Sequence, residues 1–210
     1  MRDLSAVELD ALKEVGTVGA GNAATVLASM LGQRVPMSVP EARLLPIGVI
    51  PEVVGGAESE VVGVCLGVTG DAPAAILFLL PRPAGERLVR QLLGTLSVEA
   101  ETVTFNEFER SALGEVTNIL SGAYLQALQE FTGLAFVPSP PAFAHDMAGA
   151  LLDALFAEIG RVSDYALLIE TEFLTGEQGV RGHFFLVPDP EGLVTILQAL
   201  GVRECSPEGQ

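Results

Sequence analysis

The chain has 210 residues, of which 49% are hydrophobic and 18% charged, and its mean hydropathy is +0.45. This composition excludes a disordered chain, and the length is sufficient to bury a full hydrophobic core. A net charge of −16 and an isoelectric point of about 4.3 argue against binding to nucleic acid, anionic membranes or free phosphate compounds, so action on phosphate would need positive charge from a partner.

Neither a targeting segment nor a membrane segment is evident. The longest apolar run, "APAAILFLLP", is shorter than the ~18 residues of a membrane helix and contains proline. The N-terminal "MRDLSAVELD" is acidic and amphipathic, unlike a signal peptide. Cys65 and Cys205 match no metal or redox spacing, and Cys65 is expected in the core. We therefore expect a soluble, cytoplasmic protein without membrane insertion and with no metal or cofactor of its own.

The first predicted element is a long helix. Ser5-x-x-Glu8 matches the capping box with which many helices begin. Apolar residues then recur at helical spacing until Gly32, and glycine is typical of a helix end. After a proline-containing connection, the pattern predicts two strands and a closing helix, at residues 60–68, at residues 74–80 and after Pro83.

The second half of the chain repeats this order of elements. Thr104-x-x-Glu107 predicts the start of another long helix, which ends near Gly133. An additional amphipathic helix is predicted in "HDMAGALLDALFAEIG", residues 145–160, whereas its counterpart in the first half, "IPEVVGG", is short. The remaining predicted elements are two strands and a closing helix, at residues 164–174, at residues 180–187 and after Pro190.

The two halves also match residue by residue. Residues 10–41 lie without a gap over residues 111–142, and a second segment, residues 76–94, lies over residues 183–201. We interpret the chain as a single domain made of two repeats, residues 1–103 and 104–210. The predicted fold is α+β, with two pseudo-symmetric units sharing one largely antiparallel sheet and with the two long helices side by side.

A glycine-rich stretch in the first long helix needs its own explanation. Gly19, Gly21 and Ala24 spell G-x-G-x-x-A, which is close to a dinucleotide-binding fingerprint. That fingerprint requires a strand before the glycines, whereas here a capped helix precedes them. The matching stretch of the second helix keeps only Gly122. Close packing of the two long helices is the favoured interpretation.

Polar residues at one spacing recur in both long helices. In the second helix, Ser111, Glu115 and Asn118 stand at i, i+4 and i+7, which places them on one face, and Pro141 follows after 22 residues. The first helix has the same spacing in Asp10, Glu14, Thr17 and Pro40. A polar stripe is often only a solvated helix face, but its recurrence in a second copy favours a functional role.

This pattern resembles the signature of the CheC family of bacterial and archaeal chemotaxis, which includes CheX and FliY. The shared order is Asp or Ser, then Glu, then Asn, and finally a Pro after 22 intervening residues. The resemblance covers the chain from end to end, with two signature helices. The chain shows no flagellar-switch module at its C-terminus, which favours CheC over FliY.

The resemblance implies hydrolysis of the aspartyl phosphate of the response regulator CheY, which ends the chemotaxis signal. The regulator carries its own Mg²⁺ and lysine, so an acidic phosphatase needs neither. Asn118 is expected to orient the attacking water, and Glu115 to pair with the lysine or accept a nearby hydrogen bond. Ser111 would support the docking face of the helix, and Pro141 would shape the loop behind it.

The first copy departs from the signature, because Thr17 replaces the asparagine. A hydroxyl is shorter than an amide and cannot offer both an N–H₂ donor and a carbonyl acceptor. We therefore predict one working site and one degenerate site, the latter formed by Asp10, Glu14, Thr17 and Pro40. Glu14 could still dock a partner.

Two histidines and the additional helix are further candidates for a functional role. His145 and His183 lack neighbouring metal ligands, and His183 is expected to be structural. The additional helix resembles the receptor segments on which the deamidase CheD acts, although an ordinary amphipathic helix explains the same pattern. The residues of that resemblance are Ala150, Asp153, Ala154 and Ala157.

Two alternatives to the phosphatase remain. One is a non-catalytic adaptor that binds CheY or CheD, which Thr17 favours and Asn118 disfavours. The other is a component of the flagellar switch with the same fold, which the missing C-terminal module disfavours.

Overall fold

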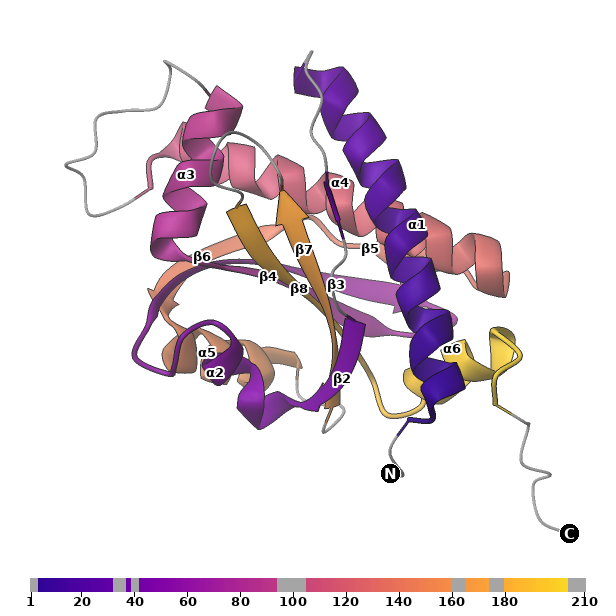
Figure 1. Cartoon of the computed structure of the whole chain (residues 1–210). Coiled ribbons are helices and arrows are strands. Elements are labelled where there is room, and N and C mark those ends of the chain that lie inside the picture. The colour runs from indigo at the N-terminus through magenta and orange to yellow at the C-terminus, as the bar shows by residue number, and fades with distance from the viewer. Residues whose placement is uncertain are drawn as a thin grey trace, which may run out of the picture.

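The computed structural model describes residues 4–31, 37–38, 42–93, 105–159, 165–173 and 180–203, and it confirms the predicted α+β class (Figure 1). The described helices are α1 (Ala6–Leu31), the 3₁₀ helix η1 (Ile47–Val49), α2 (Ile50–Val53), α3 (Arg82–Leu93), α4 (Glu107–Thr132), α5 (Ala148–Ile159) and α6 (Gly192–Ala199). The described strands are β1 (Met37–Ser38), β2 (Ala42–Pro46), β3 (Glu60–Gly70), β4 (Ala74–Pro81), β5 (Phe136–Pro138), β6 (Ala142–Met147), β7 (Tyr165–Phe173) and β8 (Val180–Pro188).

These strands form a single sheet in the order β1–β7–β8–β4–β3–β5, with β2 also paired to β7 and β6 to β3. Each of these pairings is antiparallel, as predicted. In the centre β4 pairs with β8, where Phe78 lies opposite Phe184. The edge strands were not predicted. They come from the connections after the long helices, and each pair of edge strands flanks a strand from the other half of the chain.

The sheet is covered by helices on both faces. On β4, Ile76 and Phe78 face a core shared with α1, α3, α4 and α6, whereas Leu77 and Leu79 face α2 and α5. Alternate side chains of a strand point to opposite faces, so a strand covered on both sides reads as one apolar run. The segment "AAILFLL" has this property, and the layering follows from it.

The start of α4 differs from the prediction. Asn106, not Thr104, caps the helix: its side chain accepts a hydrogen bond from the Glu109 N–H (3.0 Å), and the Glu109 carboxylate accepts one from the Asn106 N–H (2.9 Å). The predicted Thr104–Glu107 capping box is therefore wrong, and Thr104 lies outside the described residues. The segment "TFNEFE" offers two overlapping boxes, and asparagine is the stronger cap. The helix ends as predicted at Gly133, whose φ of 73° is left-handed.

The start of α1 follows the prediction. The Glu8 N–H donates to Ser5 Oγ (3.3 Å), and the Ser5 N–H donates to the Glu8 carboxylate (2.7 Å). Glu8 is fully buried and also accepts a hydrogen bond from Arg203 Nε (2.9 Å), near the C-terminal end of the described chain. The hydrogen bond from the Ser5 backbone, together with Arg203, lowers the pKa of the Glu8 carboxyl. Gly32, the predicted end of this helix, lies outside the described residues.

The two long helices cross in contact with each other, as predicted (Figure 1). At the crossing, a Cβ on Gly19 would lie 2.5 Å from Cδ1 of Tyr124 and 3.0 Å from its Cα. By contrast, a Cβ placed on Gly21 or Gly122 would have no atom of the described residues within 4 Å. Close packing is therefore confirmed for Gly19 and is wrong for Gly21 and Gly122.

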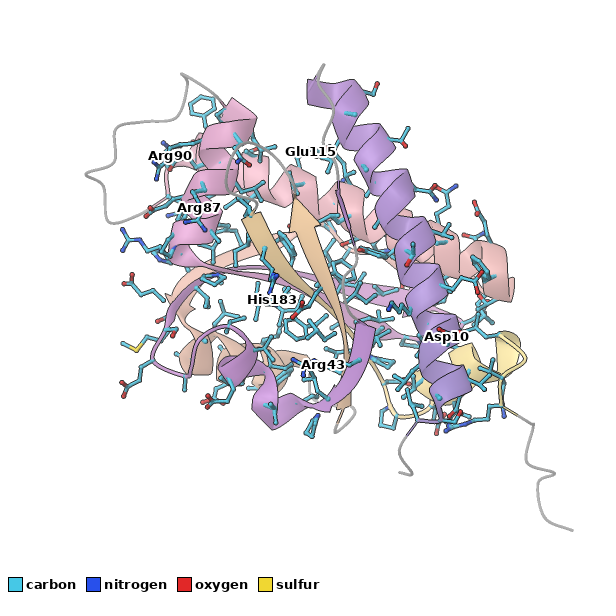
Figure 2. The ribbon with its side chains drawn as sticks, viewed as in Figure 1. Asp10, Arg43, Arg87, Arg90, Glu115 and His183 are labelled. Carbon is cyan, nitrogen blue, oxygen red and sulfur yellow. The ribbon has the colours of Figure 1, made fainter. Side chains whose placement is uncertain are left out.

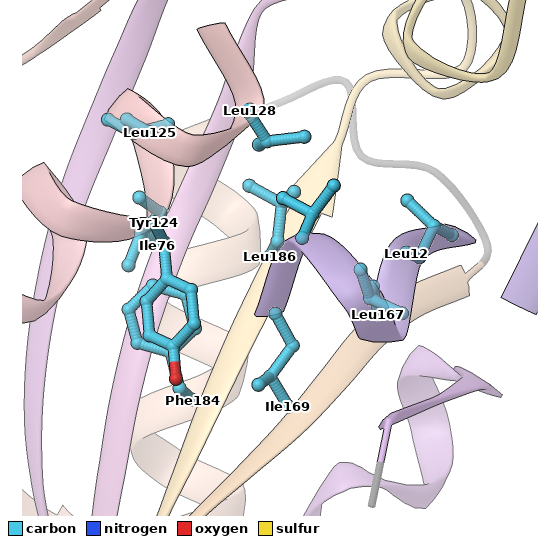
Figure 3. A pocket seen from close by; sticks show the side chains of 10 residues that line it. Leu12, Ile76, Tyr124, Leu125, Leu128, Leu167, Ile169, Phe184 and Leu186 are labelled. Atoms are coloured by element: carbon cyan, nitrogen blue, oxygen red, sulfur yellow. The ribbon is translucent and has the colours of Figure 1, made fainter. Parts of the chain in front are cut away.

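An apolar cavity lies beside this crossing, between α1, α4 and the sheet (Figure 3). Its volume is about 10 Å³, and Leu12, Tyr124 and Phe184 are among its lining residues. A single water molecule needs about that much space and several polar partners. This cavity is a packing defect in the core and has no room for a nucleotide.

Helix α5 begins later than predicted. The predicted start was His145, but His145–Met147 belong to β6 and pair with β3, so the helix starts at Ala148. The counterpart in the first half is short, as predicted, and consists of η1 and α2.

Candidate functional site

The three signature residues of α4 lie on one exposed face of the helix. Ser111, Glu115 and Asn118 are all exposed, while Leu113 and Val116, which alternate with them, are buried in the core. The spacing of 3.6 residues per turn produces this separation. The apolar side of α4 thus fixes the helix on the sheet and points the signature residues outward.

These residues share one open depression with the loop that follows the helix. The depression has a volume of about 330 Å³. Its lining consists of Val64, Arg110, Ser111, Gly114, Glu115, Asn118, Pro141 and Phe143. All four residues of the second signature are therefore brought together, although Pro141 is far from the others in sequence.

The loop that carries Pro141 is held against the helix from both sides. A Cβ on Gly114 would lie 3.8 Å from Cγ of Pro141, so the proline ring covers the bare backbone of α4 at this point. Ser139 fixes the loop to β3, because its N–H donates to the Gly67 carbonyl (2.8 Å) and its Oγ accepts from the Gly67 N–H (3.0 Å). The proline therefore forms a rigid wall of the depression.

Arg110 supplies positive charge at the depression. Its Nε donates to the Phe105 carbonyl (2.8 Å), and its guanidinium lies 5.4 Å from the ring centroid of Phe143. Phe105 in turn packs edge-on against Phe143, at 5.9 Å between centroids. This arrangement holds the cation at a site where a negatively charged group could approach an acidic protein.

The polar side chains of the depression are available to a partner. Among the described residues, Ser111, Glu115 and Asn118 have no side-chain hydrogen bond or ion pair. The Asn118 amide can donate and accept at the same time, whereas the Glu115 carboxylate only accepts. An amide, a carboxylate and a nearby guanidinium can position water and bind a cationic partner group, but none of them is an activated nucleophile.

The sequence analysis missed Arg110, Gly114 and Phe143. The predicted repeat places Lys13 opposite Gly114, and extending it by one residue places Leu9 opposite Arg110. A comparison of the copies at every position near the motif would have shown these differences.

The first signature lies on α1, away from the second (Figure 2 labels Asp10 and Glu115). Asp10, Glu14 and Thr17 are exposed, and the Thr17 hydroxyl donates to the Lys13 carbonyl of its own helix (2.9 Å). Pro40 lies outside the described residues. Threonine commonly makes this hydrogen bond to the carbonyl four residues earlier in a helix, and Thr25 and Thr117 make it here too. The degenerate first site therefore stays a prediction.

The other candidates occupy structural positions. His183 is buried on β8 with Nδ1 unpaired, and burial, with the charges of Arg181 and Arg43, lowers its pKa to about 4. His145 packs edge-on against Phe105 at 5.4 Å, and Cys65 is half-buried beside the core. Within the described ranges, no three His, Cys, Asp or Glu side chains lie close enough to hold a metal ion. Nor does any described helix have the length and hydrophobicity to cross a bilayer.

The small-residue stripe of α5, which is the segment that resembles the receptor substrates of CheD, is accessible. Ala150, Asp153, Ala154 and Ala157 are all exposed, while Leu151 and Leu152 anchor the helix to the sheet.

Comparison with known proteins gives consistent results. The CheC-like family matches residues 7–42 and 108–145, and the two segments begin 101 residues apart, the offset of the predicted repeat. The CheY-P phosphatase CheC of Bacillus subtilis is 33% identical over 196 residues, which cover 92% of this chain and 94% of that protein.

Solved structures of the same fold include the crystal structure of Thermotoga maritima FliY, with a TM-score of 0.72, 22% identity, and coverage of 96% of this chain and 99% of that chain. A complex of CheX and CheY with BeF3 and Mg²⁺ from Borrelia burgdorferi matches with a TM-score of 0.54 and 18% identity, covering 84% of this chain and 96% of that chain. The extent and level of the similarity to the Bacillus protein decide the assignment: the chain belongs to the CheC-like family.

Proposed function

We propose that this protein hydrolyses the aspartyl phosphate of the response regulator CheY and thereby ends a chemotaxis signal. The observation that carries the proposal is the depression on α4, where Glu115, Asn118 and Pro141 meet around unpaired polar side chains. The similarity over 92% of the chain to a protein named as a CheY-P phosphatase supports it. The signature face projects from the surface of a helix, which suits a protein substrate better than a small molecule.

In this mechanism the Asn118 amide carbonyl accepts a hydrogen bond from a water molecule and directs it at phosphorus, in line with the aspartyl oxygen. The water oxygen bonds to phosphorus as the bond from phosphorus to the aspartyl oxygen breaks. The carboxylate of the regulator is restored, and the protons of the water leave with the inorganic phosphate or pass to solvent. Glu115 accepts a hydrogen bond from a lysine of the regulator and fixes the docked geometry. The chain contributes positioning, because neither Asn118 nor Glu115 needs to form a covalent bond.

The electrostatics fit this division of labour. A protein with a net charge of −16 repels a phosphoryl group, so the regulator is expected to supply the positive charge with its Mg²⁺ and its lysine. Arg110 is the cation of the depression, and its contact with Phe143 keeps it at the edge, where it can attract an acidic regulator surface.

The test is loss of phosphate from phosphorylated CheY in the presence of Mg²⁺. We expect the wild type to accelerate the loss, Asn118→Ala to reduce the acceleration by about 100-fold, as for other positioning groups, and Thr17→Asn to increase it. Gln126→Ala is a matched control, since Gln126 is another exposed amide, two turns further along α4, that is paired with Glu130 (3.0 Å). If the wild type binds CheY without accelerating the loss of phosphate, the phosphatase proposal is wrong and the non-catalytic adaptor is supported instead.

We also propose that α5 binds the deamidase CheD, because its small-residue stripe is exposed along the helix. Asp153 stands within that stripe and, as a carboxylate, would be bound without being deamidated. The test is calorimetric titration of CheD into wild type and Asp153→Arg. We expect binding that this substitution abolishes, and equal binding by both would contradict the proposal.

A further inference from the structure

Phe108 is the most exposed large hydrophobic residue of the described chain, with 79% of its surface accessible. It lies in the first turn of α4, three residues before Ser111 and seven before Glu115. At 3.6 residues per turn, these intervals place its side chain on the signature face of the helix. Single exposed apolar side chains are common on protein surfaces, but this one is aligned with the signature residues, and that alignment points to a binding role.

The other end of the same face carries a bare glycine. Gly122 follows Asn118 by four residues, so it is the next position along the stripe. A Cβ on Gly122 would meet none of the described residues within 4 Å, and therefore no packing in that part of the chain requires glycine there. Since glycine weakens a helix relative to alanine, its presence at an open position is explained by a surface that must come close from outside.

We infer that Phe108 and Gly122 bound the docking footprint of the phosphorylated response regulator on α4. Phe108 packs against an apolar part of the regulator, and Gly122 lets the regulator backbone approach the helix beyond Asn118. The inference rests on the proposed function and adds two binding residues to it. The two positions are 14 residues apart, or ~21 Å along the helix, which is a distance that a protein surface spans and a small molecule does not.

The chemistry around Phe108 favours a protein partner over a membrane. Glu107 and Glu109 flank it, and the whole chain carries a charge of −16, so anionic lipid is repelled. Between Phe108 and Gly122 the same helix face carries Ser111, Glu115 and Asn118, which line the depression. A regulator that presents its phosphoryl group to Asn118 must therefore cover Phe108 as well.

The experiment measures KM and kcat for phosphorylated CheY, and separately the Kd for CheY activated with BeF3. We expect Phe108→Ala to raise KM and Kd at least about tenfold with kcat unchanged, as for an interface aromatic. Gly122→Leu should raise both KM and Kd by a similar factor while the melting temperature does not fall, because a Cβ at this position meets none of the described residues within 4 Å and leucine favours a helix more than glycine does.

Two controls are available in the chain. Phe131→Ala removes another exposed aromatic of α4, 42% accessible, which lies about 6.4 turns further along and on the other side of the helix. Gly48→Leu makes the equivalent change on η1, where, among the described residues, a Cβ would meet nothing within 4 Å either. Both variants are expected to keep the wild-type KM and Kd.

A wild-type KM and Kd for Phe108→Ala and Gly122→Leu, in an enzyme that hydrolyses the phosphate, would overturn the footprint and leave the proposed function intact. A wild type that binds activated CheY through Phe108 but does not hydrolyse the phosphate would overturn the proposed function and leave the footprint intact. A loss of kcat at unchanged Kd would also count against the footprint, because it assigns Phe108 to the chemical step.

Discussion

Gly19→Ala tests why the long helices can cross so closely. The new methyl group would lie 2.5 Å from Cδ1 of Tyr124 and 3.0 Å from its Cα. The tyrosine ring cannot move aside, since it is 2% exposed and packs on Phe184 at 4.5 Å between centroids. Because one close atom belongs to the backbone of α4, the helices themselves must separate. Overpacking of this kind costs up to about 3 kcal/mol.

Alanine also improves the helix by about 1 kcal/mol relative to glycine, so the net loss of unfolding free energy is about 2 kcal/mol. Gly21→Ala is the matched control: nothing lies within 4 Å of its Cβ, so only the gain of about 1 kcal/mol remains. Urea unfolding at 25 °C should therefore separate the two variants by about 3 kcal/mol. If Gly19→Ala is as stable as the wild type, the close-packing explanation of this glycine fails.

Three other predictions concern stability. The pKa of buried His183 is about 4, against an unfolded value of 6.5, so the unfolded state takes up this proton first as the pH falls. About 3 kcal/mol of the unfolding free energy should therefore be lost between pH 6.5 and 4. Urea titrations of His183→Leu should lack this loss, and an equal loss in both proteins would contradict the lowered pKa of His183. Glu8→Gln should cost about 3 kcal/mol at pH 7, because a neutral amide leaves the Arg203 cation without a countercharge. Because the folded pKa of Glu8 is lowered, this wild-type advantage should shrink as the pH falls below 4.5, and a constant difference down to pH 3 would refute the reasoning. Gly70→Ala should lower the melting temperature by several degrees, because φ of Gly70 is 124° and the new methyl group would overlap the Ala135 carbonyl oxygen. An unchanged melting curve would contradict this prediction and show that the turn can relax.

The elements with strong periodicity were predictable from the sequence. The apolar strands β3, β4, β7 and β8 and the two long helices appeared where expected, because burial of one or both faces leaves a clear pattern. The edge strands were not predicted. Segments such as "FVP" and "ARLLP" are short and contain proline, so their strand conformation depends on partners distant in sequence.

The candidate site shows the same limit. Spacing alone placed Ser111, Glu115 and Asn118 on one face, since a helix converts sequence distance into direction. The contact of Pro141 with Gly114 and the position of Arg110 against Phe143 depend on how the β5–β6 connection pairs with β3. No local pattern encodes that pairing, so these neighbours were visible only in the fold.

The most direct test of the account is the single-turnover rate of phosphate loss from CheY at saturating enzyme, measured for the wild type and Asn118→Ala, with the Kd for BeF3-activated CheY measured on the same samples. We expect Asn118→Ala to keep the wild-type Kd within about threefold while the rate falls about 100-fold, because the amide positions water and does not dock the partner. An Asn118→Ala enzyme with the wild-type rate at saturation would contradict the assignment of the working site to α4.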